Sequence, residues 1–345
     1  MTLAREIMMP APARREPSQR GPSVTIVCCV EAGPLETTTL YMVESLRRWG
    51  GRFAQAPVIA VTPRFGPSLK RSTRRRFDEL QVRYVRRRAA RKYSWYNFLN
   101  KPLSLNIAEE FATTETMVWL DADVFVTGAP DAFDLDAETD FAGCPSDRNL
   151  GSTGPGDRYE PYWERMCQIH GIPLERVPWV KTCREGMRIR LYFNGGILAY
   201  RKASGYAAAY LEGCIRAMDA RVRSKDAGLF FAEQVTAGLI AVQRNLRIGL
   251  LPEECNYAVG SKCEGVEAGG FGAAKVLHYH DSLWPHYFPQ LVEMCRTGKP
   301  ELYQWLNTLG PLNNTSPPIS RTLGKVLKSI RTRKSNAFEA QCEVC

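Results

Sequence analysis

The sequence has no run of the roughly 20 consecutive apolar residues that a membrane-spanning helix requires. Its beginning, MTLAREIMMPAPARREPSQRGPS, lacks the continuous apolar core of a secretory signal, so we expect residues 1–22 to form a flexible tail. The 11 cysteines are scattered without a repeated CxxC spacing, which argues against a zinc ribbon or a disulfide framework. We therefore expect reduced thiols and a cytoplasmic protein.

Acidic residues are scarce in two segments of the chain. Residues 64–92 carry 12 Lys and Arg against 2 acids, a formal charge of +10 that equals the charge of the whole chain. Residues 318–334 add six basic residues and no acid. In this second segment four apolar residues share one helical face: Leu323, Val326, Leu327 and Ile330. Basic amphipathic helices bind anionic membrane surfaces, so we expect residues 318–334 to contact one; an ordinary packed helix or a disordered tail is the alternative.

Short β-branched runs alternate with helical patterns over residues 23–310. SVTIVCCV and APVIAVTP are predicted strands that flank a predicted helix in LYMVESLRRWGG. RLYFNGGILAYRK predicts two strands joined by an Asn-Gly-Gly turn. Further strands are expected in MVWL, DFAGCP and KVLHYH, and further helices near residues 69–80, 206–221 and 229–243. This alternation predicts an α/β fold with a mostly parallel sheet and helices on both faces, as one domain over residues 23–310, followed by a linker and basic tail over residues 311–345.

The stretch MVWLDADVFV, Met117 to Val126, places two carboxylates inside an otherwise apolar run. Burying two like charges is unfavourable unless something neutralises them. A buried strand delivers its last residues to the ligand-binding rim of such a sheet, and alternation would point Asp121 and Asp123 the same way. Mn²⁺ or Mg²⁺ is the expected occupant, because hard divalent cations take carboxylate and phosphate oxygens. The alternative is an ordinary pair of turn or capping aspartates.

MVWLDADVFV also resembles the DxD segment of GT-A-fold glycosyltransferases. Three later segments resemble, in order, the NxG segment, the acidic-Gln helix and the late strand of glycosyltransferase family eight: YFNGGILAYRK, FFAEQVTAGLI and VLHYHDSLWP. The resemblance spans about residues 23–305 and implies a Rossmann-like GT-A fold. It also implies a metal-dependent transfer of a sugar from a nucleotide diphosphate sugar, with UDP favoured, to a hydroxyl of a glycan or lipid-linked saccharide.

The resemblance further implies a set of site residues. Asp121, Asp123 and His278 would hold the metal, with His280 as a competing candidate. Glu31 would lie near the base and ribose, and Lys101 and His286 near the diphosphate. Contacts to the donor sugar, including the catalytic ones, are implied for the following residues: Asp147, Asn194, Gly195, Gly196, Glu233 and Gln234. Ordinary structural explanations exist for several of these, namely a core histidine, a helix-start lysine, a loop acid and a hairpin turn.

Two departures make the chain a divergent relative. Glu233 and Gln234 stand where family-eight sequences usually have an Asp-Gln-Asp motif, so the likeness favours retention of stereochemistry without deciding it. The usual late motif HxxGxxKPW is replaced by HYHDSLWP, which lacks its Gly and Lys.

Two other functions fit parts of the sequence. In a haloacid-dehalogenase-like phosphohydrolase the first Asp of a DxD pair is a nucleophile, but that pair normally follows the first strand. Alternatively, the basic segment and its neighbouring aromatic residues could bind nucleic acid without catalysis. No nucleic-acid-binding motif accompanies that segment, so no nucleic acid partner is expected.

Overall fold

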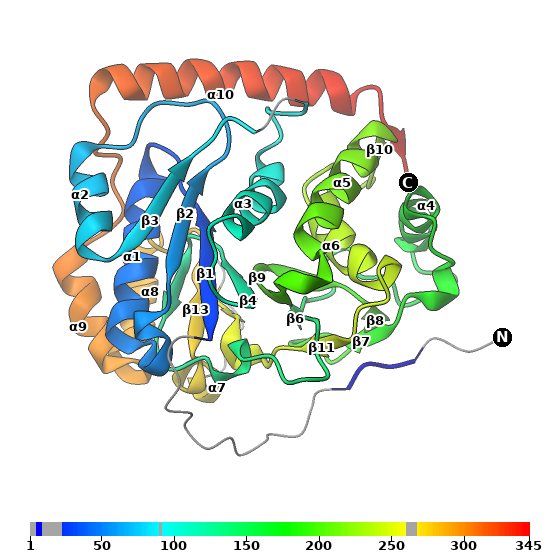
Figure 1. Cartoon of the computed structure of the whole chain (residues 1–345), viewed down its shortest axis with the longest axis horizontal. Coiled ribbons are helices and arrows are strands. Elements are labelled where there is room, and N and C mark those ends of the chain that lie inside the picture. Colours follow the sequence, from blue (N-terminus) through cyan, green and yellow to red (C-terminus); the bar gives the residue numbers. More distant parts are fainter. Residues whose placement is uncertain (1–4, 9–22, 90–91, 260–267) are drawn as a thin grey trace.

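The computed structural model describes residues 5–8, 23–89, 92–259 and 268–345, and a seven-stranded sheet forms its centre (Figure 1). In spatial order its strands are β11 (Ile248–Leu250), β6 (Phe141–Pro145), β9 (Phe193–Arg201), β4 (Thr116–Leu120), β1 (Val24–Cys29), β2 (Val58–Thr62) and β3 (Val82–Arg86). Neighbouring strands are parallel except at β9, which is antiparallel to both β4 and β6. The predicted α/β fold with a mostly parallel sheet is confirmed.

Helices cover both faces of the sheet, which explains why its central strands β1, β2 and β4 are buried along their whole length. In β4, Val118 and Leu120 pack in the core formed with α1 (Pro34–Trp49) and α2 (Arg71–Glu79). The alternate residues Met117 and Trp119 pack in the core on the other face. Four helices contribute to that second core: α3 (Asn100–Glu109), α4 (Glu160–His170), α5 (Tyr206–Asp219) and α6 (Ala232–Gln243).

The Asn-Gly-Gly segment does not form the predicted turn. Residues 194–196 lie within β9, at the irregularity where its register with β6 shifts between Gly143 and Pro145, and just before its pairing with β4 begins at Ile197. The expected first arm of the hairpin is a separate strand, β8 (Arg188–Arg190), which pairs with β7 (Trp179–Lys181). The Asn-Gly-Gly segment is therefore an irregular, bulged part of β9 rather than a reversal of the chain.

A small three-stranded sheet lies next to the end of β4. It contains β12 (Tyr257–Ala258), β13 (Val276–His278) and β5 (Val124–Val126), and β13 runs antiparallel to β5. Three helices, α7 (Ala268–Ala273), α8 (Phe288–Gly298) and α9 (Pro300–Leu309), bury its apolar residues, including Phe125 and Leu277. This sheet brings β13, which is distant in sequence, beside the residues that follow β4.

The C-terminal residues form a long helix, α10 (Pro318–Glu339), which runs along one edge of the molecule in Figure 1. After it, β14 (Glu343–Val344) pairs with β10 (Val222–Arg223). Most of the expected tail over residues 1–22 lies outside the described residues, although the Ile7 amide donates to the Trp179 carbonyl at 3.0 Å. Within the described part of the chain, no helix combines the length and apolar character needed to cross a membrane.

The buried carboxylate of Glu36 joins the beginnings of α1 and α2. Its Oε1 accepts from the Gly33 amide at 3.1 Å, and its Oε2 accepts from the Lys70 amide at 2.8 Å and the Thr73 hydroxyl at 2.7 Å. Glu36→Ala should lower the free energy of unfolding by about 2–4 kcal/mol, because three donors lose a charged acceptor. Urea unfolding measures this change.

Glu79→Ala is the control, because Glu79 is half exposed and pairs only at the surface with Arg75 and Arg76. Its cost should stay below about 1 kcal/mol. Equal losses in the two variants would contradict a structural contribution from Glu36.

Candidate functional site

Asp121 and Asp123 lie in the turn between β4 and β5, not on one face of a strand. The strand ends at Leu120, and the amide of Asp121 donates to the Gly196 carbonyl at 2.9 Å. The indole of Trp119 donates to Asp121 Oδ1 at 2.6 Å, while the Asp123 carbonyl accepts from the Tyr279 amide at 3.0 Å. The predicted convergence of the two carboxylates is thus produced by a turn and its hydrogen bonds rather than by strand alternation.

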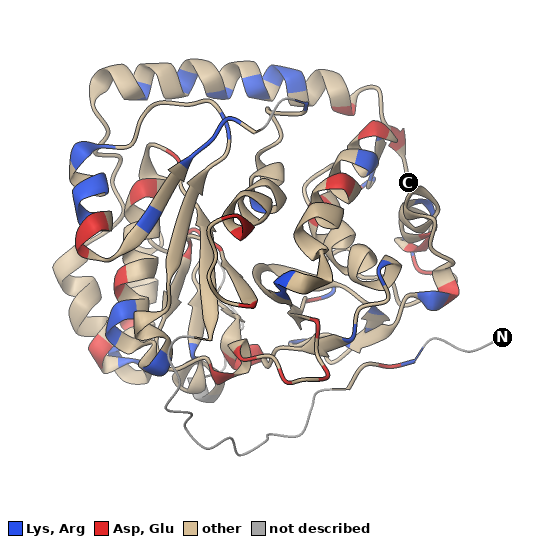
Figure 2. Cartoon of the chain, in the orientation of Figure 1, with Lys and Arg blue, Asp and Glu red and all other residues tan. Residues whose placement is uncertain are grey.

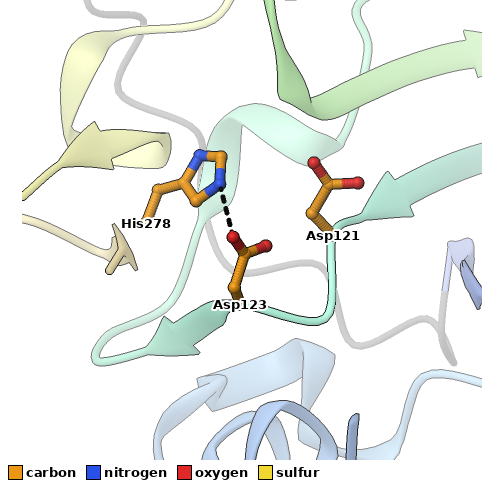
Figure 3. A group of neighbouring side chains, drawn as sticks. All are labelled: Asp121, Asp123 and His278. Atoms are coloured by element: carbon orange, nitrogen blue, oxygen red, sulfur yellow. Dashed lines mark ion pairs between the residues drawn. The ribbon is translucent and has the colours of Figure 1, made fainter. Parts of the chain in front are cut away.

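His278, the last residue of β13, completes a cluster with these two aspartates (Figure 3). One ligand atom from each of Asp121, Asp123 and His278 lies within 4.8 Å of the other two. His278 Nε2 is 3.4 Å from Asp123 Oδ2. The structure therefore brings together the three side chains predicted as metal ligands, two of them from the β4–β5 turn and one from a strand about 150 residues later.

Asn256 determines which nitrogen of His278 faces the aspartates. Its amide nitrogen donates to Asn194 Oδ1 at 3.0 Å, so its Oδ1 is the atom 3.2 Å from His278 Nδ1. An amide oxygen only accepts, so Nδ1 carries a proton and donates to it. In the neutral imidazole this leaves the lone pair of Nε2 directed at Asp123, which is the arrangement that metal-binding histidines show.

The cluster requires a positive charge. Burial raises the pKa of Asp121, and Asp123 adds to this effect against the attraction of Lys101. Burial also raises the pKa of Asp123, but the interaction with His278 outweighs it, so the pKa is lowered overall. For His278 burial lowers the pKa, and Asp123 more than reverses this. Two carboxylate oxygens and one imidazole nitrogen are also donors that suit Mn²⁺, and Mg²⁺ less well at the nitrogen.

Gly195 and Gly196 allow β9 to pass close to two polar side chains. A β-carbon on Gly196 would lie 2.5 Å from the Nδ1 and Cε1 atoms of His278, and one on Gly195 would lie 2.6 Å from Lys101 Nζ. Asn194 Oδ1 accepts from the Gly196 amide at 2.9 Å, which holds the strand here. The small residues are therefore required by the close approach of the backbone to the site.

Lys101 and Glu233 form a buried pair beside this strand. Lys101 Nζ lies 3.2 Å from Glu233 Oε1 and donates to the Gly195 carbonyl at 2.6 Å. Burial raises the pKa of Glu233 to about 7, against the opposing effect of Lys101. The Glu233 carboxyl thus changes its charge near neutral pH, which is the range in which catalytic acids and bases work.

A pocket of about 420 Å³ opens onto these groups, a size typical of sites for small ligands. Six of the predicted residues line it: Glu31, Lys101, Asp121, Asp123, Glu233 and Gln234. Arg64 lines it as well, and its guanidinium forms a two-point ion pair with Glu31. Asn194, Gly195, Gly196 and His278 lie behind this lining and contact residues of it.

The remaining two predicted residues lie elsewhere. Asp147 follows β6, does not line the pocket and lies 3.8 Å from Arg184. His286 is exposed beside Tyr287, and the pocket is lined instead by His280, whose ring stacks on His278 at 4.0 Å, and by Trp284.

The sequence analysis missed Asn256 and Arg64. Arg64 follows the strand VIAVTP, as Glu31 follows SVTIVCCV, so its place at the carboxyl end of a strand was a usable signal. Asn256 precedes a two-residue strand in a segment without periodicity, and no comparable signal marks it.

Gly196→Ala tests the close approach of β9 to His278. We expect the free energy of unfolding to fall by about 1–3 kcal/mol, because the added methyl group overlaps the imidazole. Chemical denaturation measures the change. Gly66→Ala is the matched control, since a β-carbon there would meet nothing within 4 Å. Equal stability of the two variants would show that the ring can move aside at no cost.

Solved structures similar to this chain include several glycosyltransferases. One is the bifunctional glycosyltransferase WbbM, with a TM-score of 0.45, 11% identity and coverage of 84% of this chain and 52% of that one. Another is glycosyltransferase GlyE of Streptococcus pneumoniae TIGR4, with a TM-score of 0.44, 14% identity and coverage of 86% and 66%. A third is galactosyltransferase LgtC in complex with donor and acceptor sugar analogs. Its TM-score is 0.43 and its identity is 12%, with coverage of 86% of this chain and 99% of that one. The chain thus spans about half the length of WbbM and two thirds of GlyE. A comparison with curated proteins found no match.

The sequence itself matches a domain family over residues 26–244, which is more than half of the chain. The match runs from within β1 to the end of α6 and contains the aspartate pair, the Asn-Gly-Gly segment and Glu233. The family is described as the Rhodobacterales glycosyltransferase domain. The resemblance to glycosyltransferases is therefore confirmed: the chain belongs to the Rhodobacterales glycosyltransferase domain family.

Proposed function

We propose that the chain is a metal-dependent GT-A glycosyltransferase that moves a sugar from a nucleotide diphosphate sugar, with UDP as the nucleotide, to a hydroxyl acceptor. The observation that carries the proposal is the cluster of Asp121, Asp123 and His278 at the wall of a pocket of about 420 Å³. The family match favours this function over phosphohydrolysis or nucleic-acid binding.

The residues of the cluster fit a divalent cation. His278 directs a lone pair at Asp123 across 3.4 Å, and both atoms are acceptors unless a cation or a proton lies between them. A Mn²⁺ or Mg²⁺ ion held by Asp121, Asp123 and His278 would neutralise the diphosphate and stabilise it as a leaving group. Trp119 would orient Asp121 by its hydrogen bond to Oδ1, and Asn256 would orient His278 by its hydrogen bond to Nδ1.

The other lining residues divide between the two ends of the donor. Glu31 and Arg64, paired after neighbouring strands, would hold the nucleoside, and Lys101 would face the diphosphate. Gln234 and Glu233 would hold the sugar, while Asn194, Gly195 and Gly196 would position Lys101 and His278 from behind the pocket lining. Above pH 7 or so, the Glu233 carboxylate would stabilise positive charge developing at the anomeric carbon. Asp147 and His286 would act only after movement of their loops toward the donor.

We propose further that the acceptor is a glycan or a lipid-linked saccharide, and that the enzyme works in the cytoplasm, at the inner face of a membrane. The supporting features are the two basic segments and the amphipathic pattern of residues 318–334. The domain comprises residues 23–310 in this proposal, and residues 311–345 adapt it to the membrane.

Asp123→Asn should abolish metal-dependent donor binding, because it removes a charged ligand without changing the shape of the turn. In the unchanged protein, UDP with Mn²⁺ should raise the melting temperature by several degrees, equivalent to about 2.7 kcal/mol at 100 times Kd. We expect no such shift in the variant, and donor hydrolysis at least about 100-fold slower.

Asp78→Asn is the matched control on the surface of α2, and should behave as the unchanged protein. A panel of UDP, GDP and CMP sugars with and without Mn²⁺ identifies the nucleotide. Full sugar transfer after removal of metal by a chelator would overturn the metal dependence.

Asn256→Leu tests the orientation of His278. The Nδ1–H group would lose its acceptor, so both tautomers would be populated, and Mn²⁺ affinity should fall about 10–100-fold. Titration of the apo-protein with Mn²⁺, followed by electron paramagnetic resonance, measures this affinity. Asn256→Asp keeps an acceptor for His278 Nδ1 and should retain most of the Mn²⁺ affinity. Equal loss in both variants would show that Asn256 acts through Asn194 instead.

A further inference from the structure

The long helix α10 presents apolar side chains to solvent. Ile319, Leu323, Val326 and Ile330 are 85%, 38%, 50% and 45% exposed. Their spacing of four, three and four residues places them in one row along the helix, which we call the apolar stripe. Leu327, predicted to share this face, is only half exposed and lies toward the body of the protein with Gly324 and Arg331. No residue of α10 is buried, so the stripe contributes nothing to the core.

Two basic residues adjoin the end of the apolar stripe. Arg333 and Lys334 follow Ile330 by three and four residues, and both are exposed. Arg321, Lys325 and Lys328 are also exposed and lie on the other side of the helix. The helix has no acid before its last residue, Glu339, and Figure 2 shows Lys and Arg positions recurring along it. A basic helix with an exposed apolar row matches the interface of an anionic bilayer, where acyl chains lie below negatively charged headgroups.

The helix also lies next to the donor pocket. Arg331 donates to the Phe65 carbonyl at 2.6 Å, directly after Arg64, which lines the pocket. Phe65 is 47% exposed, and the guanidinium of Arg88 lies 4.6 Å above its ring. Nearer the end of α10, Phe338 packs on Trp95 at 5.1 Å, two residues before pocket-lining Asn97. These two contacts hold the second half of the helix beside segments that line the pocket.

We propose that the apolar stripe of α10 (Ile319, Leu323, Val326 and Ile330) docks on an anionic lipid surface and so brings the donor pocket to acceptors embedded in that surface. Only the purpose of the docking rests on the proposed sugar transfer; the binding to lipid does not depend on it. A second copy of the chain is a poorer occupant, because α10 has no acid before Glu339 that could pair with the basic residues of another α10. A single row of four side chains is also small beside the roughly 800 Å² per partner of a stable interface.

The test uses the full chain and two kinds of vesicle, phosphatidylcholine alone and phosphatidylcholine mixed with phosphatidylglycerol. Cosedimentation should show binding to the anionic vesicles that weakens as salt is added, because headgroup attraction is screened. Replacing three stripe residues together, Leu323→Ser, Val326→Ser and Ile330→Ser, should weaken binding at least about tenfold. The double variant Arg333→Gln, Lys334→Gln should weaken binding to anionic vesicles by a similar factor, without changing binding to phosphatidylcholine vesicles.

Val344→Ser is the matched control, since Val344 is 48% exposed but lies in β14, away from the stripe. It should bind as the unchanged protein. Melting temperature and its shift with UDP and Mn²⁺ should be unchanged in every variant, because the altered side chains are exposed. If the unchanged protein does not bind UDP with Mn²⁺, the proposed function is contradicted. If it binds UDP with Mn²⁺ but does not bind anionic vesicles, only the docking surface is contradicted.

Two results would overturn the docking proposal. One is equal binding of the stripe variant and the unchanged protein to anionic vesicles. The other is a dimer in solution, seen by light scattering, that becomes monomeric in the stripe variant, which would show that a second copy covers the stripe.

Discussion

The site depends on the close approach of His278 Nε2 to the carboxylate of Asp123. They lie 3.4 Å apart, an approach that is favourable when a positive charge, either a proton on the imidazole or a cation, lies between them. The hydrogen bond from His278 Nδ1 to Asn256, which in turn donates to Asn194, fixes this arrangement. Because Asn194 also accepts from the Gly196 amide, the metal cluster and the strand behind it form one connected network.

This network explains why β9 is antiparallel to its neighbours and why it carries two glycines. A strand that enters between β4 and β6 from the opposite direction delivers Asn194 and Gly196 to the level at which β4 ends. There the Gly196 carbonyl accepts from the Asp121 amide, and the Gly195 carbonyl accepts from Lys101. The same short segment thus contacts the cluster on one side and the Lys101–Glu233 pair on the other.

The sequence predicted the fold class and most of the site because both have strong local signals. Short apolar runs identified β1, β2, β4 and β6, two acids in such a run identified Asp121 and Asp123, and the family resemblance added His278. The Asn-Gly-Gly turn was wrong: these residues form a bulged part of β9, and the residues that follow them pair with β4 and β6. The geometry of Asp121 and Asp123 was also wrong in detail: a turn stabilised by distant backbone groups brings them together.

Contacts between segments far apart in the sequence could not be predicted in the same way. Asn256 acts through His278 and Asn194, and nothing in its own neighbourhood indicates either partner. The exposed side of α10 is a similar case. Periodicity groups Leu327 with Leu323, but the position of the body relative to the helix decides which residues remain in water.

The charges around the pocket suggest how Lys101 is made available to a diphosphate. Arg64 is neutralised by Glu31, so among the lining residues Lys101 is the cation whose partner can lose its charge. That partner, Glu233, has a pKa of about 7, raised by burial. When Glu233 is protonated, Lys101 keeps a full positive charge for the leaving group; when Glu233 ionises, the pair becomes neutral and the carboxylate can oppose positive charge on the sugar. In the proposed reaction this buried pair would connect the two ends of the donor, and its proton would decide which end receives the charge.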